Sequence, residues 1–368
     1  MPEDNNFEKE NQITNSSCEE ISQEEELSAE NEGDIKNPPD FTALFSNIKT
    51  DESFYEKLSI KKSAKAIGLG FLLMQGLILA LNTIILTADF VLKASGVGDI
   101  GLLSDPMITE TQQILFSILS FTLPFIISFK IFSIRISDLI SFAKPEKSTV
   151  LPCFLFGIGF CSFANIVSSI AGGIFSSFGI EYNVDFPEGP KGILGFIISV
   201  IATVITPALV EEFACRGLVL GHLKKYGEGF AIIVSAILFG LVHSNFEQIP
   251  FAFLVGLVLG FITVKSGSIW PAVIVHAYNN FISIAFDYLL SAFSSQTQNI
   301  IYTIFLIINL LVGIIGVLLL KEKNEAYSLA PSDYKLLEKE KYKLFFKNGL
   351  IVIFIVICLA ESLAFFVV

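Results

Sequence analysis

Nine apolar segments separated by polar loops follow one another along residues 66–366. A helix that crosses the hydrocarbon core of a bilayer needs about 20 mainly apolar residues, and most of the segments approach or exceed this length. The segments are 66–91, 112–133, 150–173, 192–221, 229–246, 249–265, 269–290, 300–320 and 346–366. The sequence therefore predicts an all-α, polytopic integral membrane protein with eight to nine transmembrane helices, nine if the first and the last segment both cross fully.

The sixth segment is short and rich in glycine. Gly256 and Gly260 are four residues apart and share one helix face, where a neighbouring helix can approach closely. We expect this face to pack against another span, a role that requires no further function.

The composition agrees with a membrane protein and divides the chain into two parts. Hydrophobic residues make up 52% of the chain, mean hydropathy is +0.66, and 16% of residues are charged, against about 25% in soluble domains. The net charge of −12 comes from residues 1–56. We therefore predict an acidic, disordered cytoplasmic tail over 1–56 and a membrane domain over 57–368, with nothing that suggests nucleic-acid binding.

Basic residues collect in alternate loops and set an expected orientation. Four lysines between Lys57 and Lys65 precede the first segment, Lys224 and Lys225 follow the fourth, and a dense basic stretch follows the eighth. Cytoplasmic loops carry an excess of Lys and Arg, so we predict that the N-terminus and these loops are cytoplasmic. The five cysteines form no CxxC pair, and we expect neither disulfides nor cysteine metal sites.

Two acids and an arginine interrupt the fourth segment. Ionisable residues inside a span face a protein interior or a cavity, and they usually mark function. Glu212 and Arg216 are four residues apart and share a helix face, whereas Glu211 projects about 100° away. We interpret Glu212 and Arg216 as a buried ion pair that orients the site and Glu211 as free for chemistry. The alternative is an ion pair that serves only packing or transport.

Two further polar pairs lie in later apolar segments. Phe239 and His243 are four residues apart, as are His276 and Asn280, so each pair shares a helix face. Counting about 1.5 Å per residue, Glu211 and both histidines lie roughly 10–22 Å below the cytoplasmic surface. We therefore expect them to meet in one layer, although a lone histidine in a span is more often only hydrogen-bonded to a neighbouring helix.

Two other residues near this cluster have simpler interpretations. Cys215 lies on the face of Glu211 and is a candidate nucleophile, but a free buried cysteine usually behaves as a small hydrophobic residue. His222 lies beside Lys224 at the basic edge of the fourth segment, where we expect a surface or interface role.

A carboxylate beside imidazoles in a dry pocket suits proton transfer to and from water. With donors aimed at a developing oxyanion, such a site hydrolyses amides. Glu211, His243 and His276 also form a possible zinc set with an open fourth position, but HExxH is absent, so we favour a mechanism without a cofactor. A transporter or immunity factor that uses the same polar layer without catalysis is the remaining alternative.

The motifs together resemble the CAAX protease and bacteriocin-processing family (CPBP), also called Abi. They are Glu211-Glu212-x-x-x-Arg216, Phe239-x-x-x-His243 and His276-x-x-x-Asn280, with Gly267-Ser268-Ile269-Trp270-Pro271-Ala272 before the last. The resemblance covers about residues 190–285. It implies a helical intramembrane endopeptidase, of which eukaryotic members remove the last three residues of prenylated proteins.

The resemblance also implies roles for individual residues. Glu211 would activate the hydrolytic water with help from His243. His276 and Asn280 would polarise the scissile carbonyl inside an intramembrane catalytic cavity, while Glu212, Arg216 and Phe239 support the site. Expected partners are membrane lipid and a peptide or lipidated protein substrate. Bacterial members are linked to bacteriocin maturation or immunity, and we expect a multi-pass protein of the bacterial cell membrane. The sequence indicates no oligomeric state.

Overall fold

The computed structural model describes residues 52–96, 100–177, 189–290, 293–321, 328–332 and 334–364. These residues form helices and connecting turns and contain no strand, which confirms the predicted all-α class. Residues 1–51 of the predicted tail lie outside the described residues, and 52–56 belong to the first helix. The helices before the motif region are α3 (Glu52–Ala94), α4 (Pro106–Ile131), the short η1 (Ile136–Asp138) and α5 (Lys147–Ser177).

The fourth predicted segment forms one long helical stretch, Gly192–Tyr226, whose winding changes along its length. Two π-helical sections within it flank the short helix that carries the glutamates. Its parts are α6 (Gly192–Ser199), η2 (Val200–Ile205), α7 (Thr206–Glu212), η3 (Phe213–Leu220), α8 (Gly221–Leu223) and η4 (Lys224–Tyr226). Such π-helical turns occur frequently at functional sites.

The remaining helices are α9 (Glu228–Val242), α10 (Gln248–Ser266), α11 (Trp270–Leu290), α12 (Ser295–Lys321), α13 (Glu338–Phe346) and α14 (Gly349–Ala364). Most of them correspond to predicted segments, whereas α13 forms in the basic stretch before the last segment, where no helix was predicted. Within the described residues, seven helical stretches are long and apolar enough to cross a membrane. The number is eight if α13 and α14, which meet at a 70° bend, form one span.

The predicted fifth span, 229–246, is shorter in the structure. The helix α9 has 15 residues and ends before His243, which gives a length of about 22 Å. Ser244 has a φ of 46°, a left-handed conformation that cannot continue a right-handed helix. The shortening therefore places His243 at a helix end instead of within a helix.

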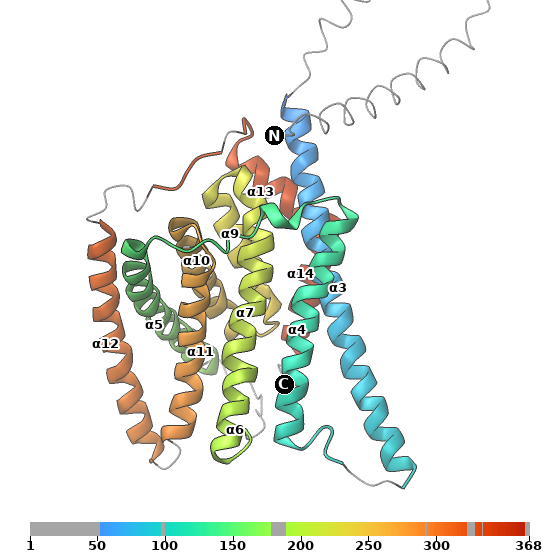
Figure 1. Cartoon of the computed structure of the whole chain (residues 1–368), viewed down its shortest axis with the longest axis vertical. Helices are drawn as coiled ribbons and strands as arrows, with labels where there is room; N and C mark the ends of the chain where they lie inside the picture. Colours follow the sequence, from blue (N-terminus) through green and yellow to red (C-terminus); the bar gives the residue numbers. More distant parts are fainter. Residues whose placement is uncertain are drawn as a thin grey trace, which may run out of the picture. The chain divides into compact units, whose positions relative to one another are not determined.

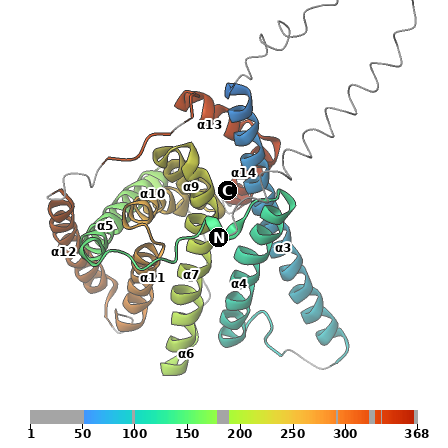
Figure 2. The same ribbon diagram turned by 45° about the horizontal axis from the view of Figure 1, so that its top comes forward.

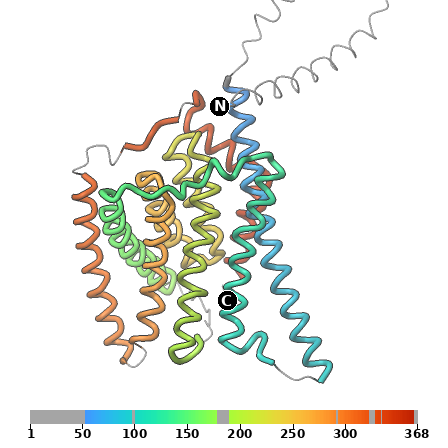
Figure 3. The backbone as a smooth tube through the Cα atoms, viewed as in Figure 1, coloured from blue at the N-terminus to red at the C-terminus, as the bar shows by residue number. Residues whose placement is uncertain are grey.

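Two groups of helices surround the long helical stretch that contains α7 (Figure 1). On one side α4 lies along α3, and α14 packs on α3. On the other side α5, α10, α11 and α12 form a second group, whose closest pairing joins α5 to α12 (Figure 3). The larger apolar core lies between α3, α4, η3, α9 and α14 and includes Phe71, Phe125, Phe239 and Phe354.

The glycine face of α10 packs as predicted. A Cβ added to Gly256 would lie 3.0 Å from the Cα of Ala236 on α9, and one added to Gly260 would lie 3.2 Å from Ile232. The two glycines therefore allow α9 and α10 to approach closely. This contact holds α9, whose end carries His243, against the rest of the core.

Candidate active site

The two glutamates lie at the end of α7, where the helix changes to the π-helical η3. Pro207, at the start of α7, lies within the continuous helical stretch, where proline removes one backbone hydrogen bond of the helix. Glu212 is completely buried, whereas the side chain of Glu211 keeps 15% of its surface exposed. The two acids therefore lie in different environments.

A buried network of charged groups is centred on Glu212. Its Oε1 accepts a hydrogen bond from Arg216 Nη1 at 2.9 Å, so the predicted ion pair is present. The same oxygen lies 2.9 Å from Nδ1 of His276. An ionised carboxylate is only an acceptor, so this hydrogen bond places a proton on Nδ1 of His276. Glu212 therefore orients both an arginine and a histidine from another helix.

Arg216 also connects the network to α10. Its Nη2 donates to the carbonyl oxygen of Gly256 at 3.3 Å. The close approach of α9 and α10 at Gly256 fixes where this carbonyl lies. Arg216 itself is 1% exposed. Its guanidinium therefore neutralises the buried Glu212 carboxylate in a place that solvent does not reach.

Glu211 faces the other nitrogen of the same imidazole. Its Oε2 lies 3.9 Å from His276 Nε2, too far for a direct hydrogen bond. His276 is therefore held between the two glutamates, fixed by one and separated by a short gap from the other. Glu211 thus lies beside an imidazole, as expected from the shared depth of the two residues, and it is the more accessible of the two acids.

The ring of Phe239 lies among three polar side chains. Its centroid is 5.1 Å from the ring of His243 and 5.9 Å from that of His276, both edge to face. The guanidinium carbon of Arg216 lies 4.2 Å from the same centroid, within the range of a cation–π contact. Phe239 therefore brings the two predicted histidines next to a common apolar surface.

His243 is oriented by the end of its own helix. Its Nδ1 lies 2.8 Å from the carbonyl oxygen of Phe239, and because a carbonyl only accepts, Nδ1 carries the proton. Nε2 has no hydrogen-bond partner within the part of the chain that the structure describes. In the neutral ring it is a free acceptor, which suits a proton-accepting role.

Residues from α3 and α14 fix the turn after His243, and the sequence analysis missed them. Ser244 Oγ donates to Glu361 Oε2 at 2.6 Å, and Gln75 Nε2 donates to the same oxygen at 3.0 Å. Glu361 is an acid within the last apolar segment, and an ionisable residue inside a span is itself a signal of function. That signal could have identified it.

Asn280 is partly committed to structure. Its Nδ2 donates to the carbonyl oxygen of Thr203 in η2 at 3.0 Å, and its Oδ1 lies 3.4 Å from Asn279 Nδ2. One N–H of the amide remains for another acceptor. The bond to Thr203 ties α11, which carries His276, to the π-helical section before the glutamates.

The other two candidates differ from each other. Cys215 is 1% exposed and its backbone carbonyl accepts from Ser235 Oγ, an environment typical of structural cysteines. His222, expected at a surface or interface, is buried, and its Nε2 lies 2.8 Å from Ser63 Oγ. Of the two expected positions, the surface one is wrong, because α3 covers this edge of the helix, and His222 lies in the interface between the two helices.

A metal centre was the alternative arrangement for this site. Over the described ranges, no three His, Cys, Asp or Glu side chains lie close enough together to hold a metal ion. Nδ1 of His276 is hydrogen-bonded to Glu212, and Nδ1 of His243 to a backbone carbonyl. These bonds leave only the Nε2 atoms as ligand positions.

Comparison with known proteins agrees with the motifs. Neither the curated proteins nor the solved structures compared with the chain gave a match. One family model matches, described as type II CAAX prenyl endopeptidase Rce1-like, over residues 193–282. This range contains every residue described above for the candidate active site, with the exception of Glu361, Ser63 and Gln75. Residues 193–282 are thus similar to the Rce1-like CAAX endopeptidases, the family that the motifs in this region resemble.

Proposed function

We propose that the protein is an intramembrane endopeptidase that hydrolyses peptide bonds with a water molecule activated by Glu211. The observation that carries this proposal is the pairing of a partly exposed carboxylate with an imidazole that a buried Glu212–Arg216 pair holds in place. A fixed acid–base pair with a defined proton position is what general acid–base catalysis requires.

The residues have separate roles in the proposed reaction. Glu211 takes a proton from water while the water oxygen attacks the scissile carbonyl carbon. The remaining N–H of Asn280 and a protonated Nε2 of His276 donate to the oxyanion. Glu211 then returns the proton to the amide nitrogen as the C–N bond breaks.

His243 assists this reaction from the other side of Phe239. Its Nε2 is the free acceptor described above. It can accept a hydrogen bond from the water molecule that Glu211 activates. Ser244 and Glu361 keep the imidazole at the helix end. No hydrogen bond or ion pair joins the side chains of His243 and Glu211 among the described residues, so we assign His243 a supporting proton-accepting role.

We propose substrates that are themselves membrane-bound, either lipidated proteins or peptides with a membrane anchor. The site lies within helical segments that are apolar enough to cross a bilayer, so a folded soluble domain could not reach it. A flexible tail tethered to the membrane could, because the anchor raises its local concentration. We propose access from the cytoplasmic side, in keeping with the basic loops.

The test is cleavage of a peptide set by the purified full chain in lipid vesicles. We expect Glu211→Gln to abolish cleavage while the thermal unfolding midpoint stays unchanged, because Glu211 lacks a direct hydrogen bond to the core. Glu247→Gln, at an exposed position, is the matched control and should cleave normally. Near-normal turnover by Glu211→Gln would refute the assignment.

A further inference from the structure

A pocket lined by lysines lies at one end of the helical bundle, away from the proposed catalytic residues. Its volume is about 820 Å³, within the usual range for small-molecule sites. We call it the lysine pocket, because six lysines line it. They are Lys57, Lys61, Lys62, Lys65, Lys343 and Lys347. A single acid, Glu340, lines it with them.

The lysines come from two helices that lie side by side. The first four are on the N-terminal part of α3. Lys343 is on α13, which packs on α3 (Figure 2), and Lys347 directly follows the last residue of α13. On α3, Lys57 and Lys61, and likewise Lys61 and Lys65, are four residues apart. Like charges at this spacing repel each other and destabilise a helix.

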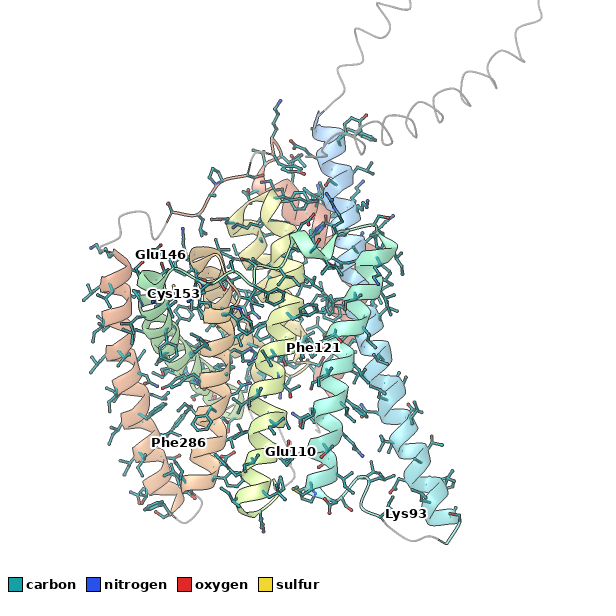
Figure 4. All side chains as sticks on the ribbon, in the orientation of Figure 1. Lys93, Glu110, Phe121, Glu146, Cys153 and Phe286 are labelled. Carbon is teal, nitrogen blue, oxygen red and sulfur yellow. The ribbon has the colours of Figure 1, made fainter. Side chains whose placement is uncertain are left out.

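Within the described residues, the lysine pocket lacks the counter-charges that three other lysines of this chain have. Lys224 pairs with Glu228, and the buried Lys341 pairs with Glu338. Lys93, at the opposite end of α3 (Figure 4), pairs with Asp89. Across the described part of the chain, none of the six pocket lysines forms an ion pair. An external anion would therefore relieve the repulsion.

The pocket is held in shape by buried contacts. Lys341 Nζ donates to the carbonyl oxygen of Tyr226 at 2.9 Å, and the Tyr226 hydroxyl lies 2.7 Å from both Ser59 Oγ and Ser63 Oγ. These bonds fix α13 and α3 to the end of η4. A binding site built on fixed helices loses little entropy when a ligand binds.

The pocket lies at the boundary between polar and apolar chain. The apolar part of α3 begins at Ala66, directly after Lys65, and the apolar helix α14 begins at Gly349, directly after the pocket residues Lys347 and Asn348. Leu58, Phe132 and Leu344 also line the pocket. A headgroup bound to the lysines would leave its acyl chains beside the apolar surfaces of α3 and α14.

We propose that the lysine pocket binds the phosphate headgroup of an anionic phospholipid. Basic pockets between membrane helices are a known way to bind such headgroups. The N-terminus of α14 adds to the attraction, because its Gly349 lines the pocket and helix N-termini favour anions. This site is independent of the proposed protease activity.

The test is titration of the detergent-solubilised full chain with fluorescent phosphatidylglycerol and, separately, with fluorescent phosphatidylcholine. We expect tighter binding of phosphatidylglycerol. Lys61→Gln/Lys65→Gln and Lys343→Gln/Lys347→Gln should each weaken it about 10- to 30-fold, because each lysine near an anionic lipid contributes about a fivefold factor. Lys61→Arg/Lys65→Arg should retain binding.

Lys130→Gln/Lys339→Gln is the matched control, because both lysines are exposed and neither lines the pocket. An equal loss in this control, or equal binding of phosphatidylcholine, would overturn the proposal. Displacement of the lipid by inorganic pyrophosphate at equal concentration would identify a site for soluble phosphates instead.

A second measurement uses the unmodified chain and does not depend on folding of the variants. Photoreactive phosphatidylglycerol should crosslink to peptides that contain residues 57–65 and 343–347. Crosslinks confined to other peptides would also overturn the proposal.

Discussion

At the scale of single residues, His276 is the most informative side chain. It is fixed by Glu212 through Nδ1 and faces Glu211 through Nε2, so one imidazole connects the structural acid to the proposed catalytic acid. Arg216 is required for this arrangement because it neutralises Glu212 in a fully buried position. Two buried polar atoms, Glu212 Oε2 and Arg216 Nε, have no hydrogen-bond partner among the described residues.

We predict that Arg216→Ala lowers both the yield of folded protein and its activity. The change leaves the Glu212 carboxylate buried without its cation, which costs about 3–5 kcal/mol. Thermal unfolding and peptide cleavage, measured on the same preparation, check this. Glu211→Gln should lose only activity, and a normal unfolding midpoint for Arg216→Ala would contradict the role of the ion pair.

We also predict that hydrolysis needs no metal ion. The reason is that HExxH is absent from the sequence, and that no three His, Cys, Asp or Glu side chains of the described residues lie close enough together to hold a metal ion. Activity should survive treatment with a chelator and dialysis. Stoichiometric zinc, with activity lost on its removal and restored on its return, would instead support Glu211, His243 and His276 as ligands.

At the scale of helices, close packing of α9 and α10 holds the site together. The contact depends on Gly256, whose carbonyl also accepts from Arg216. The two π-helical sections also help to position the site. The section η2 supplies the carbonyl oxygen that Asn280 binds, and η3 follows directly after the glutamates. Small changes in helix spacing should therefore alter catalysis as well as stability.

We predict that Gly256→Ala destabilises the protein by about 1–3 kcal/mol and reduces cleavage. The added methyl group would lie 3.0 Å from the backbone of Ala236, so α10 must shift away from α9. Gly76→Ala is the matched control, because nothing lies within 4 Å of its Cβ position. The thermal unfolding midpoint should fall for the first variant and stay or rise for the second.

At the scale of the whole membrane domain, the ends of the bundle differ in charge. The lysine pocket lies at the end where α3 begins and where α13 packs, whereas α11 and α12 are joined at the other end (Figure 1). By the positive-inside rule, the lysine end should face the cytoplasm. The proposed site would then be reached from the same side as the basic loops.

We predict that a cysteine at Lys224 reacts with a membrane-impermeant thiol reagent only from the cytoplasmic side. A cysteine at Gln296, near the start of α12, should react only from outside. Labelling of intact cells and of inverted vesicles distinguishes outward-facing cysteines from cytoplasmic ones. Reversed labelling would refute the orientation and the proposed route of substrate access, but it would leave the lysine pocket proposal intact.

The sequence by itself determined the class of protein, most of the helices and the pairing of Glu212 with Arg216. Hydrophobic length and four-residue spacing are local properties, so they can be read along the chain. Only the tertiary structure decided that His276 bonds to Glu212, that Phe239 joins both histidines, and that Glu361 supports the turn after His243. The contacts between different helices join residues 37 to 117 positions apart, and no local pattern encodes them. The burial of His222 and the early end of α9 likewise depend on neighbouring helices and on one left-handed residue.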